Sequence, residues 1–287
     1  MTSSALLDAL RALRDGHRDE ALRSVRQAPP SLLADSLAGY LDTGERVGVY
    51  DQPAAFQAFI TGGGNVGLYE ATARALASAH AEVGSPSVLD IGCGDGAALV
   101  PALAQGRGVS ALDLVELSAA LLDTALHRLR AAGVTATAHH GTAQDFSAAL
   151  RQDQRWDVVE STFALHTIPE AERGDVLTRL RPHTDRIVVV EFDVPDYAPD
   201  GDDRLVFLAD TYERGLAEYS EDRDLVANGF LMPVLVGQLT PGAARVTYEQ
   251  PAEAWAAQLR DRGYRDVRYE RLFPYWSSPA FVLTGRG

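Results

Sequence analysis

Three glycines alternate with other residues directly after a short apolar run, in the segment 88–96 (VLDIGCGDG). Glycines at such a turn let the backbone bend sharply and approach a ligand closely. Asp90 lies two residues before the first glycine, Gly92, at the expected end of a strand. A carboxylate at this point favours a ligand with a cationic amino group over a pyrophosphate. The segment 92–97 also satisfies the loose dinucleotide pattern GxGxxA, so the loop alone leaves a nicotinamide cofactor open.

Further polar residues follow the next expected strands. Glu116 is a candidate to accept hydrogen bonds from a ribose, with Asp113 in the same strand as the alternative. The segment 141–146 (GTAQDF) places an amide, Gln144, and a carboxylate, Asp145, where they can bind the amino group of an adenine. These residue types together favour an adenosine ligand that carries an amino group.

Composition excludes several chemistries. The 287 residues include 26 basic side chains, all of them arginine, against 40 acidic ones, for a formal net charge of −14. Without lysine, a Schiff-base lysine or a Walker A lysine is impossible. The acidity argues against nucleic acid or an anionic membrane as a partner. A single cysteine, Cys93, excludes an intrachain disulfide, and no metal site is implied. With no apolar stretch of membrane-spanning length, a cytoplasmic protein is expected.

Short apolar runs alternate with helical segments from residue 86 onward, which predicts βαβ units and a mostly parallel sheet. The connection 274–279 between the last two runs is too short for a parallel crossover and predicts an antiparallel hairpin. The expected fold is therefore a Rossmann-like, doubly wound α/β sheet with a reversed strand at its end. The expected strands are 87–91, 109–115, 134–139, 156–161, 186–193, 265–273 and 280–284.

In this order the motifs resemble the class I S-adenosylmethionine (SAM)-dependent methyltransferases. The match runs through VLDIGCGDG, LVELSAALLDTA, GTAQDF, WDVVESTFALHTIPEAER and RIVVVEF to the terminal hairpin, over residues 65–287. The resemblance implies a seven-stranded sheet with an antiparallel last strand. It also implies SAM as the cofactor, with S-adenosylhomocysteine (SAH) as its product. No metal is implied.

The resemblance assigns roles to residues of this chain one motif at a time. It implies that Asp90, Gly92 and Gly94 line the methionine part of SAM and that Glu116 accepts from the ribose hydroxyls. The adenine is expected beside a set of residues from the second and third strands, and the sulfonium beside a pair that ends the fourth strand. These are Leu117, Gln144, Asp145 and Phe146 for the adenine, and Glu160 and Ser161 for the sulfonium.

Candidates for the acceptor side come from outside the shared core. His166, just past the fourth strand, is a candidate general base, and its alternative role is to order the loop by a hydrogen bond. Tyr50 is a second candidate, able to reach the SAM carboxylate or the acceptor. The glycine run 61–65 is expected to be a mobile lid or else a plain linker. The predicted acceptor-lining residues are Tyr212, Tyr219, Met232 and Trp276.

We therefore expect two regions: an N-terminal helical region and lid over 1–64, and a methyltransferase domain over 65–287 with a helical cap at about 200–245. The expected activity is methyl transfer to a small organic acceptor, in secondary metabolism, with the acceptor atom (O, N or C) left open. The alternative is a SAM-binding enzyme of the same fold that catalyses a cyclisation or rearrangement. The N-terminal helices are a candidate homodimer interface.

Overall fold

A computed structural model describes residues 2–43, 52–106, 108–198 and 201–287. The chain divides into two compact units. The first unit comprises Met1–Val66, Asp196–Arg245 and Tyr275–Ser278, and the second comprises Gly67–Pro195, Val246–Pro274 and Pro279–Gly287. The functional division into an N-terminal helical region and lid over 1–64 and a methyltransferase domain over 65–287, with a cap at about 200–245, stays a prediction.

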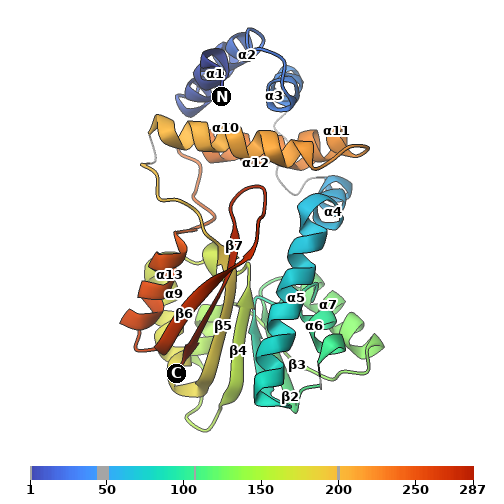
Figure 1. The fold of residues 1–287 in the computed structure, drawn as a ribbon, viewed down its shortest axis with the longest axis vertical. Helices are drawn as coiled ribbons and strands as arrows, with labels where there is room; N and C mark the ends of the chain where they lie inside the picture. The colour runs from blue at the N-terminus through green and yellow to red at the C-terminus, as the bar shows by residue number, and fades with distance from the viewer. Residues whose placement is uncertain (1, 44–51, 107, 199–200) are drawn as a thin grey trace. The chain divides into compact units, whose positions relative to one another are not determined.

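A seven-stranded sheet forms the second unit (Figure 1), in the order β3-β2-β1-β4-β5-β7-β6. Strand β7 runs antiparallel to both β5 and β6, while the other pairs are parallel. This arrangement confirms the predicted doubly wound sheet with a reversed strand. The strands are β1 (Ser87–Ile91), β2 (Ala111–Glu116), β3 (Thr137–His140), β4 (Trp156–Thr162), β5 (Thr184–Phe192), β6 (Arg265–Phe273) and β7 (Ala280–Arg286).

Helices cover both faces of this sheet because successive strand residues point to opposite sides. Val88 of β1 packs into a core with helices α5, α6 and α7, while its neighbour Leu89 packs into a second core with α9 and α13. Figure 1 shows these two sets of helices on opposite faces of the sheet. The helices are α5 (Gly63–Val83), α6 (Leu99–Gln105), α7 (Ala119–Ala131), α8 (Ala143–Ala148), α9 (Glu170–Leu180) and α13 (Ala252–Asp261).

The first unit is helical. Ser31, which follows Pro29-Pro30, caps α3 by accepting a hydrogen bond from the N–H of Ala34. The carboxylate of Glu213 binds two more free N–H groups of this first turn, those of Leu32 and Leu33. The helices are α1 (Ser4–Arg14), α2 (Arg18–Val25), α3 (Leu32–Asp42), α4 (Pro53–Thr61), α10 (Asp202–Ala217), α11 (Arg223–Val226) and α12 (Met232–Leu239).

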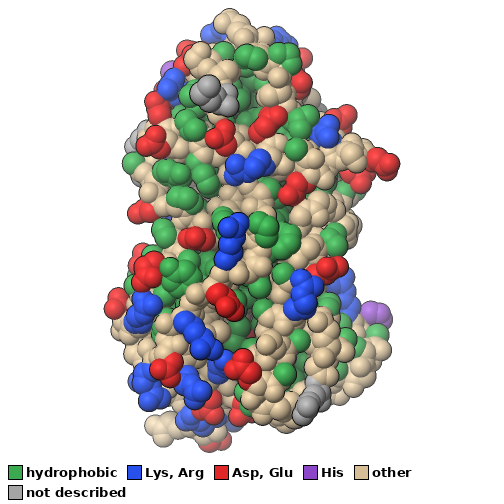
Figure 2. Space-filling model, viewed as in Figure 1, with side chains coloured by type: hydrophobic (Ala, Val, Ile, Leu, Met, Phe, Trp, Pro, Cys, Tyr) green, Lys and Arg blue, Asp and Glu red, His purple; other side chains and the backbone are tan. Residues whose placement is uncertain are grey.

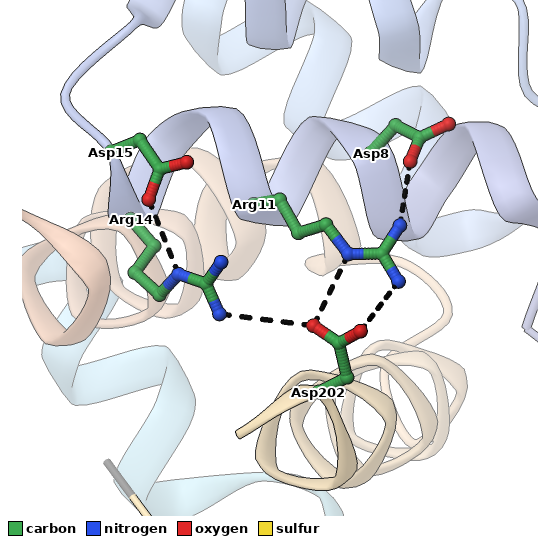
Figure 3. Close-up of polar contacts among 5 residues, drawn as sticks. All are labelled: Asp8, Arg11, Arg14, Asp15 and Asp202. Carbon is green, nitrogen blue, oxygen red and sulfur yellow. Dashed lines mark hydrogen bonds and ion pairs between the residues drawn. The ribbon is translucent and has the colours of Figure 1, made fainter. Parts of the chain in front are cut away.

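Charged side chains join α1 to α10 on the surface of this unit. Asp202 accepts hydrogen bonds from Nε and Nη2 of Arg11, at 3.1 and 2.7 Å, and Arg14 lies 3.7 Å away (Figure 3). Asp8 of α1 pairs with Arg11, and Asp15, the residue that follows α1, pairs with Arg14. Figure 2 shows how acidic and basic side chains intermingle in the same way over one face of the molecule, so the net charge is not gathered into one patch there.

The glycine run 61–65 lies where two helices meet. Thr61 ends α4, Gly62 is its cap, and α5 begins at Gly63. The carboxylate of Glu218 accepts from the N–H of Gly64, and Tyr219 packs over Gly62 and Gly63. Further along the chain, a π-helical turn at Ala227–Leu231 joins α11 to α12.

Candidate functional site

The glycine loop after β1 has a backbone that other residues rarely adopt. Gly92, Gly94 and Gly96 have φ angles of +74°, +55° and +79°. A Cβ at Gly92 would collide with Ala164, whereas a Cβ at Gly94 would meet nothing within 4 Å. The loop therefore packs closely on one side and faces open space at Gly94, which leaves room for a ligand against the backbone.

Glu116 holds this loop in place from the end of β2. Its carboxylate is largely buried and accepts from the N–H groups of Gly94, at 3.0 Å, and Ser118, at 2.8 Å. The next residue, Leu117, is 65% exposed. Asp113, the other acid of the strand, is bonded to His139 and accepts from the indole N–H of Trp156. Its carboxylate thus has internal partners, while Glu116 lies beside the glycine loop.

Two buried acids lie side by side at the sheet edge next to this loop. Asp90 of β1 and Glu160 of β4 are register partners, 1% and 0% exposed. Oδ1 of Asp90 and Oε1 of Glu160 have no hydrogen-bond partner among the described residues. Burial, with the charges of Glu160 and Glu116, raises the pKa of Asp90 well above its ordinary value. Unsatisfied buried acceptors of this kind suit a ligand with hydrogen-bond donors or a positive charge.

Ser161 and His80 complete the surroundings of Glu160. The hydroxyl of Ser161 donates to the backbone oxygen of Ile91, so it joins β4 to β1. Nε2 of His80, on α5, lies 2.6 Å from Oε2 of Glu160, and both side chains are almost fully buried. His80 was missed by sequence analysis, because nothing in a helical segment indicates that one histidine meets a strand 80 residues away.

The segment after β3 forms the short helix α8. Its cap, Thr142, accepts from the N–H of Asp145 and donates to the Asp145 carboxylate. The amide of Gln144 donates to Glu172. The ring of Phe146 packs between His139 and Trp156, with centroids 4.8 and 6.0 Å away. The exposed Asp145 and the half-buried Gln144 and Phe146 thus occupy consecutive positions at the start of one helix.

His166 follows β4 and meets a carboxylate of the next strand. Its Nδ1 lies 2.7 Å from Oε2 of Glu191, and its backbone N–H donates to Oε1 of the same residue. Burial lowers the pKa of His166, but the charge and hydrogen bond of Glu191, with the charge of Glu249, outweigh burial and raise the pKa above its ordinary value. A histidine held this way through Nδ1 presents Nε2 for proton transfer.

A buried arginine fixes the loop that carries this histidine. Arg173 of α9 is 0% exposed, lies 3.9 Å above the ring of Trp255 and donates to the backbone oxygens of Leu165 and Tyr248. The N–H of Tyr248 in turn donates to the backbone oxygen of His166. Glu191 and Arg173 were missed by sequence analysis, although an acid inside the apolar run RIVVVEF is a signal that a buried charge needs a partner.

Not all predicted site residues gather in the second unit. Tyr50 lies outside the described residues. The acceptor-lining candidates belong to the first unit and are buried there: Trp276 packs edge-to-face on Tyr212, and the hydroxyl of Tyr219 donates to the backbone oxygen of Phe59. Met232 is 0% exposed. Their roles toward an acceptor stay predictions.

Comparison with known proteins shows what this chain is similar to. A family model described as "Methyltransferase domain" matches residues 88–185, from β1 to the start of β5. A comparison with curated protein sequences gave no significant match. Among solved structures, the chain is similar to magnesium protoporphyrin IX methyltransferase (ChlM) from Synechocystis PCC 6803 with bound SAH, at 16% identity and a TM-score of 0.54, over 83% of this chain and 95% of that one.

A second similar structure is PigF with SAH, at 15% identity and a TM-score of 0.53, over 98% of this chain and 70% of that one. At such identities the likeness establishes the fold. The chain therefore has the fold of the class I SAM-dependent methyltransferases, and the match to the methyltransferase family model covers its glycine loop and the strands β1–β4.

Proposed function

We propose that this protein transfers a methyl group from SAM to a small organic acceptor. The observation that carries the proposal is the buried, unsatisfied carboxylate of Asp90 beside a glycine loop whose backbone at Gly94 faces open space. This pairing suits a ligand that presents an ammonium group to the carboxylate and lies against the backbone of the loop. The site needs no lysine, because SAM brings its own positive charge.

The donor would be held by the residues that the sequence motifs single out. Asp90, Gly92 and Gly94 address the methionine part, and Glu116 accepts from the ribose. A carboxylate that already holds the loop backbone is fixed in orientation before the ligand binds, which lowers the ordering cost of binding. We propose the same adenine and sulfonium partners as the motifs predict, namely Leu117, Gln144, Asp145 and Phe146 for the adenine and Glu160 and Ser161 for the sulfonium.

The chemistry asked of the protein is modest. Bound SAM supplies an activated methyl group on a sulfonium, so the side chains have to orient the acceptor, exclude water and remove a proton where the acceptor carries one. His166 is placed to take that proton at Nε2, while Glu191 holds the imidazole through Nδ1 and stabilises its protonated form. Arg173 and Tyr248 keep the loop of His166 in position from the other side.

A small acceptor fits the acidic chain, which repels polyanions. The names of the similar structures, a porphyrin methyltransferase among them, support the same class of acceptor. Among the described residues, no helix is long and apolar enough to cross a bilayer. The helices α1–α3 stay a candidate dimer surface, which sedimentation of the protein with and without residues 1–42 would test.

The test of the proposal is ligand binding followed by product analysis. SAH should raise the melting temperature of the wild-type protein, and Asp90→Ala or Glu116→Ala should abolish the shift. Incubation with SAM and a panel of small acceptors should yield a product heavier by one methylene unit. No melting-temperature shift at millimolar SAH would refute the donor site, and a product of unchanged mass would instead favour a cyclisation or rearrangement.

A further inference from the structure

Three acids from neighbouring strands lie buried where we propose that the donor binds. Asp90 and Glu160 are register partners on adjacent parallel strands, which lie about 4.8 Å apart, and both point to the face covered by α5. Glu116 adds a third carboxylate from β2. Burial away from water, with the charges of Glu160 and Glu116 nearby, therefore disfavours ionisation of Asp90.

His80 binds one oxygen of Glu160. Its Nε2 contacts Oε2 of Glu160, while Oε1 of Glu160 has no hydrogen-bond partner among the described residues. Oδ1 of Asp90 likewise has none. Each acid therefore keeps one unsatisfied oxygen on the face of the sheet that α5 covers. The described residues contain no group of three or more His, Cys, Asp or Glu side chains arranged to hold a metal ion, so an organic cation is the better match.

The other titratable groups near Asp90 come from the glycine loop and from α5. In the loop, Asp95 is paired with Arg128 of α7, 2.8 Å away. Burial, Asp90 and Glu116 raise the pKa of the Cys93 thiol, so it stays protonated. From α5, Tyr69 has its pKa raised to about 12 by burial and by Asp95, and it too stays neutral. His80 is thus the basic group that the described contacts bring to the three buried acids.

From this geometry we infer that Asp90 keeps its proton in the ligand-free protein, beside Glu160, and that binding of the donor's ammonium group displaces this proton to the solvent. The carboxyl O–H bond breaks, the proton passes to water or buffer, and the ammonium takes over as counter-charge. His80 is a positioning residue that fixes Glu160 for this exchange. The inference rests on the proposed function and adds that donor binding is linked to pH.

Calorimetry with SAH measures the linkage directly, without an acceptor or turnover. The heat of binding to the full chain, in buffers of different ionisation enthalpy at one pH, gives the number of protons released. We expect about one proton per SAH bound and an affinity that rises from about pH 6 to about pH 8, by at most about tenfold per pH unit.

Two variants test whether the proton release comes from the buried acids or from the negative charge of the protein in general. Glu160→Gln removes one acid and should reduce the proton count by at least about half, because Asp90 then ionises more readily. Glu270→Gln removes an exposed acid of β6 in the same unit and should leave the count unchanged.

A wild-type count of zero overturns the inference whether or not either variant folds, and so does an unchanged count in Glu160→Gln. A different result bears on the proposed function. If SAH gives neither heat nor a melting-temperature shift, the donor site is absent, and the inference falls with it.

Discussion

Nδ1 of His166 lies 2.7 Å from Oε2 of Glu191, and both side chains are largely buried, 14% and 1% exposed. The carboxylate also accepts from the backbone N–H of His166, so one residue fixes both the ring and the loop that carries it. A partner that favours the protonated imidazole makes the histidine a stronger base than an isolated one. The pair therefore has the form of a base with its orienting acid.

Glu191→Gln should lower the pKa of His166 because it removes the charge that outweighs burial. The titration of the His166 ring, followed by NMR, measures the change. Glu249→Gln is the matched control, since the charge of Glu249 contributes less to the same pKa. A pKa of His166 that stays raised in Glu191→Gln, or that falls as far in Glu249→Gln, would contradict the assignment.

The same pair predicts how stability depends on pH. The pKa of His166 is raised in the folded state, so its contribution to stability is fully present below the unfolded value of about 6.5 and is lost as pH rises through the folded value. The melting temperature of Glu191→Gln should therefore fall further below wild type at about pH 5.5 than at about pH 9. An equal deficit at both pH values would show that the loss is one of packing.

His166→Ala should retain donor binding and lose catalysis. If His166 removes a proton from the acceptor, methyl transfer should fall by about a hundredfold to ten-thousandfold, while the melting-temperature shift caused by SAH stays as in wild type. Transfer of a labelled methyl group from SAM measures catalysis, and thermal unfolding with and without SAH measures donor binding. His127→Ala, on the exposed face of α7, serves as control. Unchanged turnover with an unchanged pH profile would leave His166 a role only in ordering its loop.

Gly94→Ala and Gly133→Ala separate backbone strain from loss of ligand space. Both glycines have positive φ, +55° and +75°, and a Cβ at either would meet nothing within 4 Å. Each substitution should cost about 1 kcal/mol of unfolding free energy. Only Gly94→Ala should also weaken SAH binding, because its methyl group enters the space beside the glycine loop. Denaturant unfolding and calorimetry measure the two effects, and equal SAH affinity in both variants would argue against a ligand at Gly94.

Asp202→Asn tests the ion network between α1 and α10 (Figure 3). The hydrogen bond from Arg11 lowers the pKa of Asp202, so the stabilisation is present above the unfolded pKa and is lost as pH falls through the folded one. Because the network is exposed, we expect only a small drop in melting temperature near neutral pH, which shrinks in high salt. A drop of the same size in high salt would assign the effect to packing instead.

The elements of the sheet could be read from the sequence because their signals are local. The strand predicted at 87–91 has the bounds of β1. The shortness of the connection 274–279 was enough to predict that β7 runs antiparallel to β6. The helix start within the glycine run 61–65 was not predicted, because the carboxylate and ring that hold it come from Glu218 and Tyr219, more than 150 residues away.

By itself, the sequence determined the acidic net charge and the absence of lysine. It also determined the glycine loop and the acids Asp90 and Glu116 at the ends of the first two strands. Only the tertiary structure decided which groups face them. His80 reaches Glu160, and Glu191 reaches His166, across elements that no spacing in the chain connects. Side-chain partners buried between a helix and a sheet depend on how those elements pack, whereas strands and turns follow from local residue preferences.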